Sequence, residues 1–297
     1  MILLPNIVQR VYAKSRAIRQ EIRFRCQVLM TDLSHLEYFV MFVGNPRSGT
    51  TLVRTWLDAH PNVVIGNEVH TLRLMKAGKN WPAVVGRVLE NSSRFAKNPT
   101  WTGYSYRIPN YPRSSREMIT VIGDKRAAGT TKALIEEPAL LFDLFNFSPL
   151  PIRFIHCVRH PYDVIATRTR RNELAMEYNH ERYFQLEKGA AHLFSLLGPE
   201  QCKRIYHEAL IANPTDVLQD LLQFLGLTAE PAYLKACQAM IYDKPHQSRF
   251  KSEWTAQAMA AVEQEALCCD HLSYYLNGGR LLFDERSFNE ASIETTD

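Results

Sequence analysis

A strand, a glycine-containing loop and a helix follow one another early in the chain, and this unit constrains the fold more than any other segment. Tyr38–Val43 reads YFVMFV, a continuous apolar run that is typical of a strand buried on both faces of a parallel sheet. The run ends in the segment GNPRSGTT, and residues 50–59 then have the pattern of a helix. This unit predicts an α/β fold.

The alternation of strands and helices continues along the chain. Short apolar runs predict further strands at 63–65, 118–122, 153–158 and 204–206. Helical patterns stand between and after them, at 69–76, 82–95, 138–145, 216–225 and 258–276, with one more beginning near Pro161. We therefore expect a P-loop-like parallel sheet flanked by helices, in a single domain over 31–297 with a helical C-terminal portion.

Polar residues follow four of these strands. They are Arg47 with its neighbours, Glu68, Lys125 and Arg159. In open parallel sheets, ligands bind at the carboxyl ends of the strands. The sequence therefore predicts that these side chains converge on one site.

The basic charge of the chain is concentrated near its start. The formal net charge is +4, but residues 1–30 contain six Lys and Arg against one Glu, so the remainder is nearly neutral. A neutral body argues against nucleic acid as a partner. Residues 6–30 are predicted as a basic helix, which either packs across the domain or contacts a membrane surface or a partner protein. Formation of a homodimer is a further hypothesis.

Cysteine spacing and hydropathy indicate the compartment. The six cysteines include no C-x-x-C pair and no disulfide-like pattern, which is typical of reduced thiols. No apolar run reaches the roughly 18 residues of a transmembrane helix, and no signal-peptide pattern is present. We expect a cytoplasmic protein. No Cys, His or carboxylate spacing is typical of a metal site, so no metal is expected.

The loop after the first strand has the chemistry of an anion site. It keeps the G-x-x-x-x-G frame of a P-loop, but Thr50 stands where triphosphate-binding loops carry Lys. Arg47 supplies a cation within the loop, and the N-terminus of the next helix supplies free N–H donors. The loop therefore predicts a nucleotide phosphate site that is not built for triphosphate–Mg²⁺ chemistry. Two alternatives are a kinase or NTPase with an unusual loop, and a nucleotide-binding protein without catalysis.

Three segments resemble one enzyme family. PRSGTT followed by LVRTWLDAHPNVVIGNE resembles the 5′-phosphosulfate loop of sulfotransferases that use 3′-phosphoadenosine 5′-phosphosulfate (PAPS), and FIHCVRHPYDVIATR resembles their 3′-phosphate motif. YHEALIANPTDVLQDLLQFLGL resembles a third family segment, so the likeness covers roughly residues 38–228 in ordered pieces. The motifs are most similar to those of tyrosylprotein sulfotransferases and their bacterial relatives.

The resemblance implies a sulfotransferase fold, PAPS as co-substrate and a set of donor-binding residues. It places the 5′-phosphosulfate on Arg47, Ser48, Gly49, Thr50 and Thr51. It places the 3′-phosphate on Arg159 and Thr167, the adenine beside Tyr206, and a closing C-terminal loop at Ser248, with Arg249 and Lys251. A donor with phosphate at both ends of one adenosine agrees with two separate anion sites.

The resemblance also implies the catalytic residues. Glu68 matches the family's general base, and Lys125 with Arg47 matches the residues that stabilise the leaving phosphate. We expect partial burial to raise the pKa of Glu68 toward neutrality. His70 is a rival base; alternatively, Glu68 caps the following helix, and Lys125 pairs with the adjacent Asp124.

The acceptor is less constrained by the sequence. A peptidyl tyrosine is the first hypothesis, and a glycan or a small phenol is the alternative. The aromatic loop at 97–116, with Trp101, Tyr104, Tyr106 and Tyr111, suits a tyrosine. Arg168, Arg170 and Arg171 either attract an acidic acceptor or form a solvated helix face.

Overall fold

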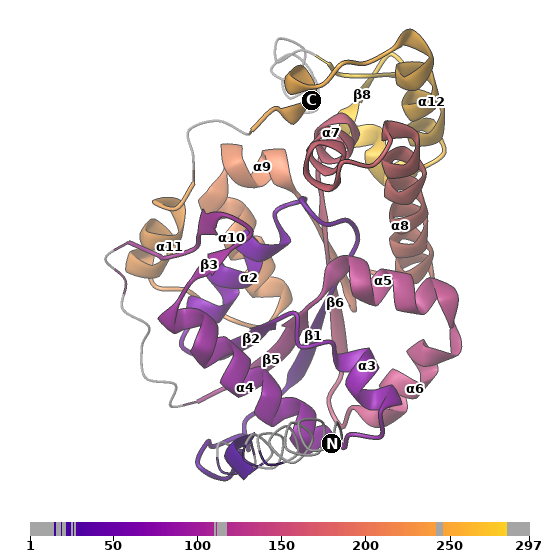
Figure 1. The fold of residues 1–297 in the computed structure, drawn as a ribbon. Coiled ribbons are helices and arrows are strands. Elements are labelled where there is room, and N and C mark those ends of the chain that lie inside the picture. Colours follow the sequence, from indigo (N-terminus) through magenta and orange to yellow (C-terminus); the bar gives the residue numbers. More distant parts are fainter. Residues whose placement is uncertain are drawn as a thin grey trace, which may run out of the picture.

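A central parallel sheet organises the molecule, which was analysed as a computed structural model (Figure 1). The structure describes residues 15, 19, 22–24, 26, 28–109, 111, 118–241 and 246–283. Most of the basic helix predicted at 6–30 lies outside the described residues, so that helix and its partner stay predictions.

The sheet has five strands in the order β2-β5-β1-β6-β7, and every neighbouring pair is parallel. The strands are β1 (Tyr38–Val43), β2 (Val63–Asn67), β5 (Val121–Lys125), β6 (Ile152–Val158) and β7 (Cys202–Tyr206). The predicted α/β class and all five predicted strands are confirmed. The prediction for β5 was wrong in its limits, because the strand begins three residues later than expected and runs through Gly123, Asp124 and Lys125.

Helices cover both faces of this sheet (Figure 1). They are α2 (Thr50–Ala59), α3 (Thr71–Lys76), α4 (Trp81–Lys97), α5 (Ala127–Glu136), α6 (Ala139–Phe147), α7 (Pro161–Asn172), α8 (Met176–Leu197), α9 (His207–Ala212), α10 (Pro214–Phe224), α11 (Pro231–Gln238) and α12 (Ala256–Leu267). The smaller elements are two 3₁₀ helices, η1 (Ser248–Lys251) and η2 (Asp270–Tyr275), and two strand pairs, β3 (Thr100–Trp101) with β4 (Tyr104–Ser105) and β8 (Leu276–Asn277) with β9 (Arg280–Leu281). The helix predicted at 258–276 therefore ends nine residues early, at Leu267.

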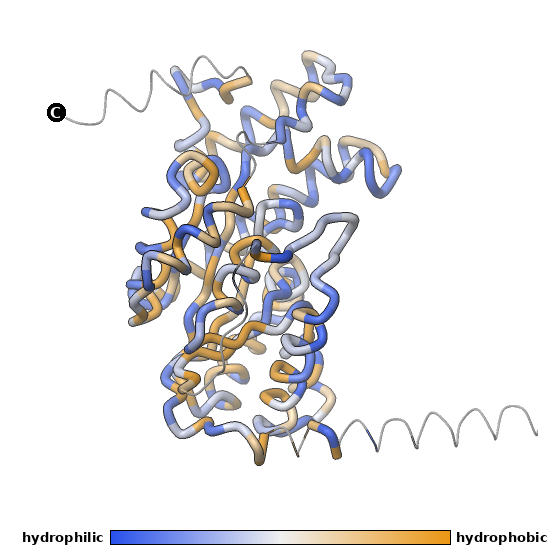
Figure 2. The backbone as a smooth tube through the Cα atoms, turned by 90° about the vertical axis from the view of Figure 1, so that its left-hand side faces the viewer, coloured by the Kyte–Doolittle hydropathy of each residue, from blue (hydrophilic) through white to orange (hydrophobic). Residues whose placement is uncertain are grey.

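Alternate residues of β1 enter two separate cores. Val40 and Phe42 pack with α2, α10 and α11, whereas Phe39 and Met41 pack with α4, α6 and α8. All four side chains are buried. Figure 2 shows that hydrophobic residues are concentrated along the backbone in the middle of the molecule. A strand buried on both faces explains why its sequence is continuously apolar.

The ends of the strands place the polar residues together. The loop 44–49 follows β1, Glu68 follows β2, Lys125 ends β5, Arg159 follows β6 and His207 follows β7. Because the strands are parallel, these positions lie at one edge of the sheet. In the part of the chain that the structure describes, no helix is both long enough and apolar enough to cross a membrane.

Candidate active site

A cleft of about 640 Å³ lies at this edge of the sheet. Most of the site residues predicted from the sequence line it: Arg47, Gly49, Thr50, Thr51, Glu68, Lys125, Arg159, Thr167 and Ser248. Ser48 and Tyr206 do not belong to the lining. The cleft thus joins the predicted anion sites and the predicted catalytic residues in one volume.

The loop 44–49 has the backbone that an anion site requires. Gly44 and Gly49 have φ values of +94° and +86°, in the left-handed region that favours glycine. Arg47 also lies there, at φ 71°, although it is not glycine. The helix α2 begins directly after Gly49, without a side-chain cap, so its first N–H groups are available to a ligand.

Two buried polar atoms near this loop suggest what it binds. The hydroxyl of Ser48 has no hydrogen-bond partner among the described residues, and neither has Nδ1 of His207. A side chain at Gly49 would come within 2.7 Å of that Nδ1 atom, so His207 lies directly against the loop. Unpartnered buried donors are costly unless a ligand satisfies them. Because His207 lines the cleft, a phosphate or phosphosulfate group bound there meets that need for its ring nitrogen.

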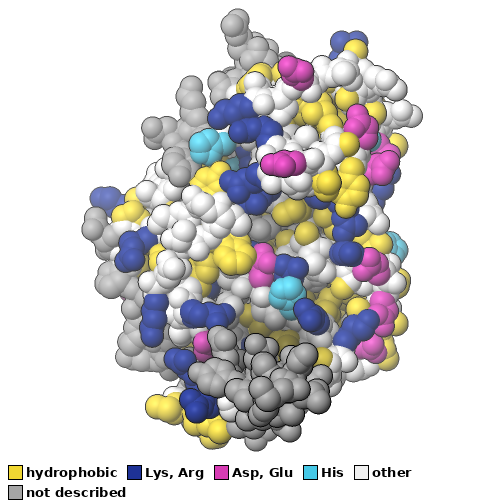
Figure 3. Space-filling model, viewed as in Figure 1, with side chains coloured by type: hydrophobic (Ala, Val, Ile, Leu, Met, Phe, Trp, Pro, Cys, Tyr) yellow, Lys and Arg dark blue, Asp and Glu magenta, His cyan; other side chains and the backbone are white. Residues whose placement is uncertain are grey.

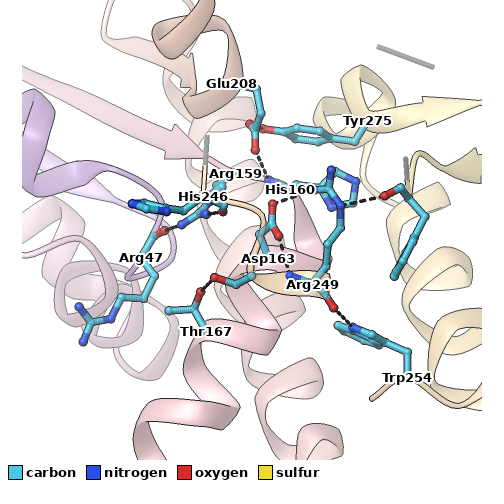
Figure 4. A network of polar contacts seen from close by, with 12 residues as sticks. Arg47, Arg159, His160, Asp163, Thr167, Glu208, His246, Arg249, Trp254 and Tyr275 are labelled. Carbon is cyan, nitrogen blue, oxygen red and sulfur yellow. Dashed lines mark hydrogen bonds and ion pairs between the residues drawn. The ribbon is translucent and has the colours of Figure 1, made fainter. Parts of the chain in front are cut away.

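A second anion site forms around Arg159. Its Nη1 donates to the Arg47 carbonyl at 3.1 Å, and its Nη2 donates to the His246 carbonyl (Figure 4). The hydroxyl of Thr167 donates to that of Ser248 at 2.8 Å, which brings α7 and η1 together. Figure 4 shows the Arg47 side chain extending away from Arg159, so the two cations serve different parts of the cleft.

Arg249 and Lys251, the other residues expected in the closing loop, have different positions. Lys251 lines the cleft. Arg249 is buried and forms an ion pair with Asp163 at 2.7 Å, and its backbone N–H donates to the same carboxylate at 2.9 Å. Arg249 therefore attaches η1 to α7, and it does not line the cleft.

The candidate base forms a charged pair at the floor of the cleft. Glu68 Oε1 lies 3.2 Å from Lys125 Nζ, and its Oε2 pairs with Arg126. The Lys125 side chain is only 4% exposed, whereas that of Glu68 is 26% exposed and can meet a substrate. Glu68 also has a left-handed backbone, with φ 60°.

The expected rise in the pKa of Glu68 was wrong. Burial does raise this pKa, but Lys125 and Arg126 together outweigh burial and hold it below the ordinary value. Burial also lowers the pKa of Lys125, while Glu68 opposes that shift. Glu68 is therefore ionised near neutral pH, which is the form that accepts a proton.

The alternative interpretations of this pair do not agree with the structure. Asp124, not Glu68, accepts from the backbone N–H groups of Val69 and Thr71 at 2.9 Å, where α3 begins. Asp124 is thus engaged there, and Lys125 pairs with Glu68. His70 does not belong to the cleft lining, and burial followed by the nearby Arg126 lowers its pKa. Glu68 is the better placed of the two candidate bases.

One residue predicted for the site, Tyr206, lies outside the cleft lining. The Tyr206 hydroxyl donates to the His271 carbonyl at 2.9 Å, and its ring stacks on Tyr274, so Tyr206 is occupied outside the cleft. Its neighbour His207 lines the cleft instead. Burial and then Arg159 hold the pKa of His207 well below its ordinary value, so the ring is neutral. His207 is the residue after Tyr206 in the YHEAL segment, so that segment was the sequence signal that could have identified it.

The aromatic loop contributes one wall of the cleft. The β3–β4 hairpin places Trp101, Tyr104 and Tyr106 in the lining, whereas Tyr111 packs on Tyr233 in the core. Arg171 donates to the Thr102 carbonyl at 3.1 Å and lies over the Tyr104 ring. The hairpin is therefore attached to α7 across the cleft.

The basic cluster on α7 divides into two parts. Arg170 and Arg171 line the cleft, together with Lys251. Arg168 instead turns into the protein, where it donates to Asn45 and Asn179. Figure 3 shows Lys and Arg side chains gathered on this face, near the positions of α7 and α9.

The fold also assembles one group of residues that sequence spacing could not reveal. Within the described ranges, His156, Glu187 and His271 bring ligand-type atoms within 4.8 Å of one another, and all three residues are buried. They come from β6, α8 and η2 and are far apart in sequence. The expectation of no metal stays a prediction.

Comparisons with known proteins agree with this geometry. A family model described as the sulfotransferase family matches residues 146–231. A putative protein-tyrosine sulfotransferase of Caenorhabditis briggsae is 27% identical over 203 residues, covering 66% of this chain and 68% of the relative. The protein-tyrosine sulfotransferase of Drosophila melanogaster is 23% identical over 208 residues, covering 66% of this chain but only 39% of the relative.

A solved structure shows the same fold. The sulfotransferase domain from the curacin biosynthetic pathway superposes with a TM-score of 0.51 at 17% identity, covering 82% of this chain and all of that domain. Together with the family match, this confirms the resemblance that the three motifs predicted. The chain has the sulfotransferase fold, and its sequence is related to the sulfotransferase family.

Proposed function

We propose that this protein transfers the sulfuryl group of PAPS to an acceptor hydroxyl, with a peptidyl tyrosine as the first candidate acceptor. One observation carries the proposal: two anion sites, at the loop 44–49 and at Arg159 with Thr167 and Ser248, open into the same cleft as Glu68 and Lys125. A donor with phosphate on both ends of one adenosine matches this pair of sites. A loop without the usual Lys argues against triphosphate chemistry.

The residues divide the reaction among themselves. The acceptor oxygen attacks sulfur, the bond from sulfur to the phosphate oxygen breaks, and adenosine 3′,5′-bisphosphate leaves. Glu68 accepts the proton of the acceptor hydroxyl. Arg47 and Lys125 stabilise the negative charge that develops on the leaving phosphate, within a partly buried site where such contacts are strong.

The charged surroundings of Glu68 favour a phenolic acceptor. Lys125 and Arg126 lower its pKa, and a carboxylate of low pKa is a weak base. A tyrosine hydroxyl, with a pKa of about 10, releases its proton more readily than an alcohol does. The aromatic wall of Trp101, Tyr104 and Tyr106 supports the same choice, as do the names of the two relatives.

The test is a labelled-donor assay with a tyrosine peptide, a small phenol and a glycan. We expect transfer to the peptide, and Glu68→Gln should lower turnover roughly 100- to 10,000-fold while donor binding is kept. Glu137→Gln is the matched control, because Glu137 forms an exposed ion pair with Lys76 and does not line the cleft. Unchanged turnover in Glu68→Gln would remove Glu68 from the mechanism. Mg²⁺-dependent ATP hydrolysis would favour the kinase alternative.

A further inference from the structure

The helix α8 was not predicted from the sequence. It contacts both anion-binding segments of the cleft, the loop 44–49 and the segment at Arg159. It packs between α5 and α7 (Figure 1). Tyr183 and Glu187 are four residues apart, so they lie on the same side of the helix, and both are fully buried. Neither residue lines the cleft.

The first contact holds the phosphate loop. Asn45, the second residue of that loop, is fully buried. Its Nδ2 donates to the Tyr183 carbonyl at 3.0 Å and to Glu187 Oε1 at 2.9 Å, and its Oδ1 accepts from Arg168 at 3.3 Å. With both its donor hydrogens and its acceptor in use, the Asn45 side chain has one available orientation.

The second contact holds the segment of the other anion site. The Tyr183 hydroxyl donates to the Arg159 carbonyl at 3.1 Å. One residue of α8 therefore bonds to Asn45 through its carbonyl and to Arg159 through its side chain. Arg168 adds a further connection, because its Nε donates to Asn179 of α8 at 3.2 Å.

Two buried histidines hold the Glu187 carboxylate in this arrangement. His271 Nε2 lies 2.7 Å and His156 Nε2 lies 3.1 Å from Glu187 Oε2. Burial raises the pKa of Glu187, but the two histidines outweigh burial and hold it well below the usual range, so the carboxylate only accepts. His156 also fills the space beside Gly44, where an added Cβ would lie 2.3 Å from the ring.

We propose that α8 fixes the spacing between the two anion sites, with Tyr183 and Glu187 as positioning residues. The inference rests on the proposed donor site. A ligand with two phosphates gains from both sites only when their separation is already correct, whereas a ligand with one phosphate does not sense that separation. Buried ion clusters contribute little to stability on their own, which favours a positioning role.

Two nucleotides separate this role from a general structural one. Adenosine 3′,5′-bisphosphate occupies both sites, and adenosine 5′-phosphate occupies only the first. Calorimetry on the full chain should show that Tyr183→Phe lowers affinity for the bisphosphate roughly two- to tenfold and leaves the monophosphate unchanged. Tyr233→Phe is the matched control, since its buried hydroxyl donates to the Trp56 carbonyl at 2.7 Å elsewhere in the core.

Glu187→Gln tests the same idea from the loop side. It should lower affinity for both nucleotides, and by a larger factor for the bisphosphate, because loop and spacing are both disturbed. If this variant does not fold, Tyr183→Phe still decides the question. Equal factors for the two nucleotides in Tyr183→Phe, or no loss with either, would overturn the inference.

Two further outcomes are distinguishable. One equivalent of bound metal in the purified protein, absent from Glu187→Gln, would overturn the inference by making Glu187 a metal ligand. A protein that shows the expected difference between the nucleotides but transfers no sulfuryl group would refute the proposed function and support the role of α8.

Discussion

Removal of the Arg159 guanidinium tests the two-site donor cleft most directly. Two of its N–H groups already donate to the carbonyls of Arg47 and His246, and Nε has no partner among the described residues. One charge-assisted bond from Nε to a phosphate is worth about 1.5–3 kcal/mol. At about 1.4 kcal/mol for each factor of ten, Arg159→Met should weaken bisphosphate binding roughly 10- to 150-fold.

The assay is calorimetric titration with adenosine 3′,5′-bisphosphate and adenosine 5′-phosphate. The loss should be confined largely to the bisphosphate, because the 5′-phosphate belongs to the loop 44–49. Arg153→Met is the control. The Arg153 side chain, near the start of β6, also donates to a backbone carbonyl, that of Phe224, but it does so far from the cleft. A loss below about threefold, or the same loss with both nucleotides, would refute the assignment of Arg159 to the second phosphate.

Three other perturbations have defined outcomes. Because Arg126 lowers the pKa of Glu68, Arg126→Gln should raise that pKa, and the acid limb of the kcat/KM profile against pH should move to higher pH. An acid limb that stays at the same pH would contradict the ion pair between Arg126 and Glu68. Gly44→Ala should reduce the free energy of unfolding, measured by chemical denaturation, by more than the roughly 1–2 kcal/mol of a left-handed alanine, because the buried His156 ring occupies the position of the added Cβ. Gly103→Ala is the control: Gly103 also has positive φ but lies in open space, so this variant should lose only the cost of the backbone strain. Arg249→Met removes the guanidinium that pairs with the buried Asp163 carboxylate and should reduce the free energy of unfolding by about 3–5 kcal/mol; a loss under 1 kcal/mol would contradict the buried ion pair.

The parts of the fold that the sequence predicts are those with local signals. The apolar run of β1 and the glycines of the loop after it determine their conformation with little help from elsewhere. β5 was misplaced because Asp124 and Lys125 look like loop residues. They are tolerated in a buried strand because α3 supplies N–H groups to Asp124 and Glu68 supplies a carboxylate to Lys125.

The end of α12 was misjudged for a different reason. Cys269, Leu272 and Tyr275 recur every three residues and are all buried in one core. That spacing suits an α-helix and a 3₁₀ helix equally, so the periodicity alone could not show the change after Leu267.

The positions of the candidate site residues were predictable where a local sequence motif contains the residue. Arg47, Glu68 and Arg159 follow strands and Lys125 ends one, and the parallel sheet brings them together. The low pKa of Glu68 was not predictable, because it depends on how Lys125 and Arg126 are oriented in space.

Several residues that line the cleft have strained backbone conformations. Of the five residues other than glycine at positive φ in the described chain, Arg47, Glu68 and Thr102 line the cleft. Such conformations cost of order 1–3 kcal/mol each. Glycine at these positions would relieve that cost, but at Arg47 and Glu68 it would also remove a side chain of the proposed mechanism. Thermal stability and turnover are thus opposed at Arg47 and Glu68.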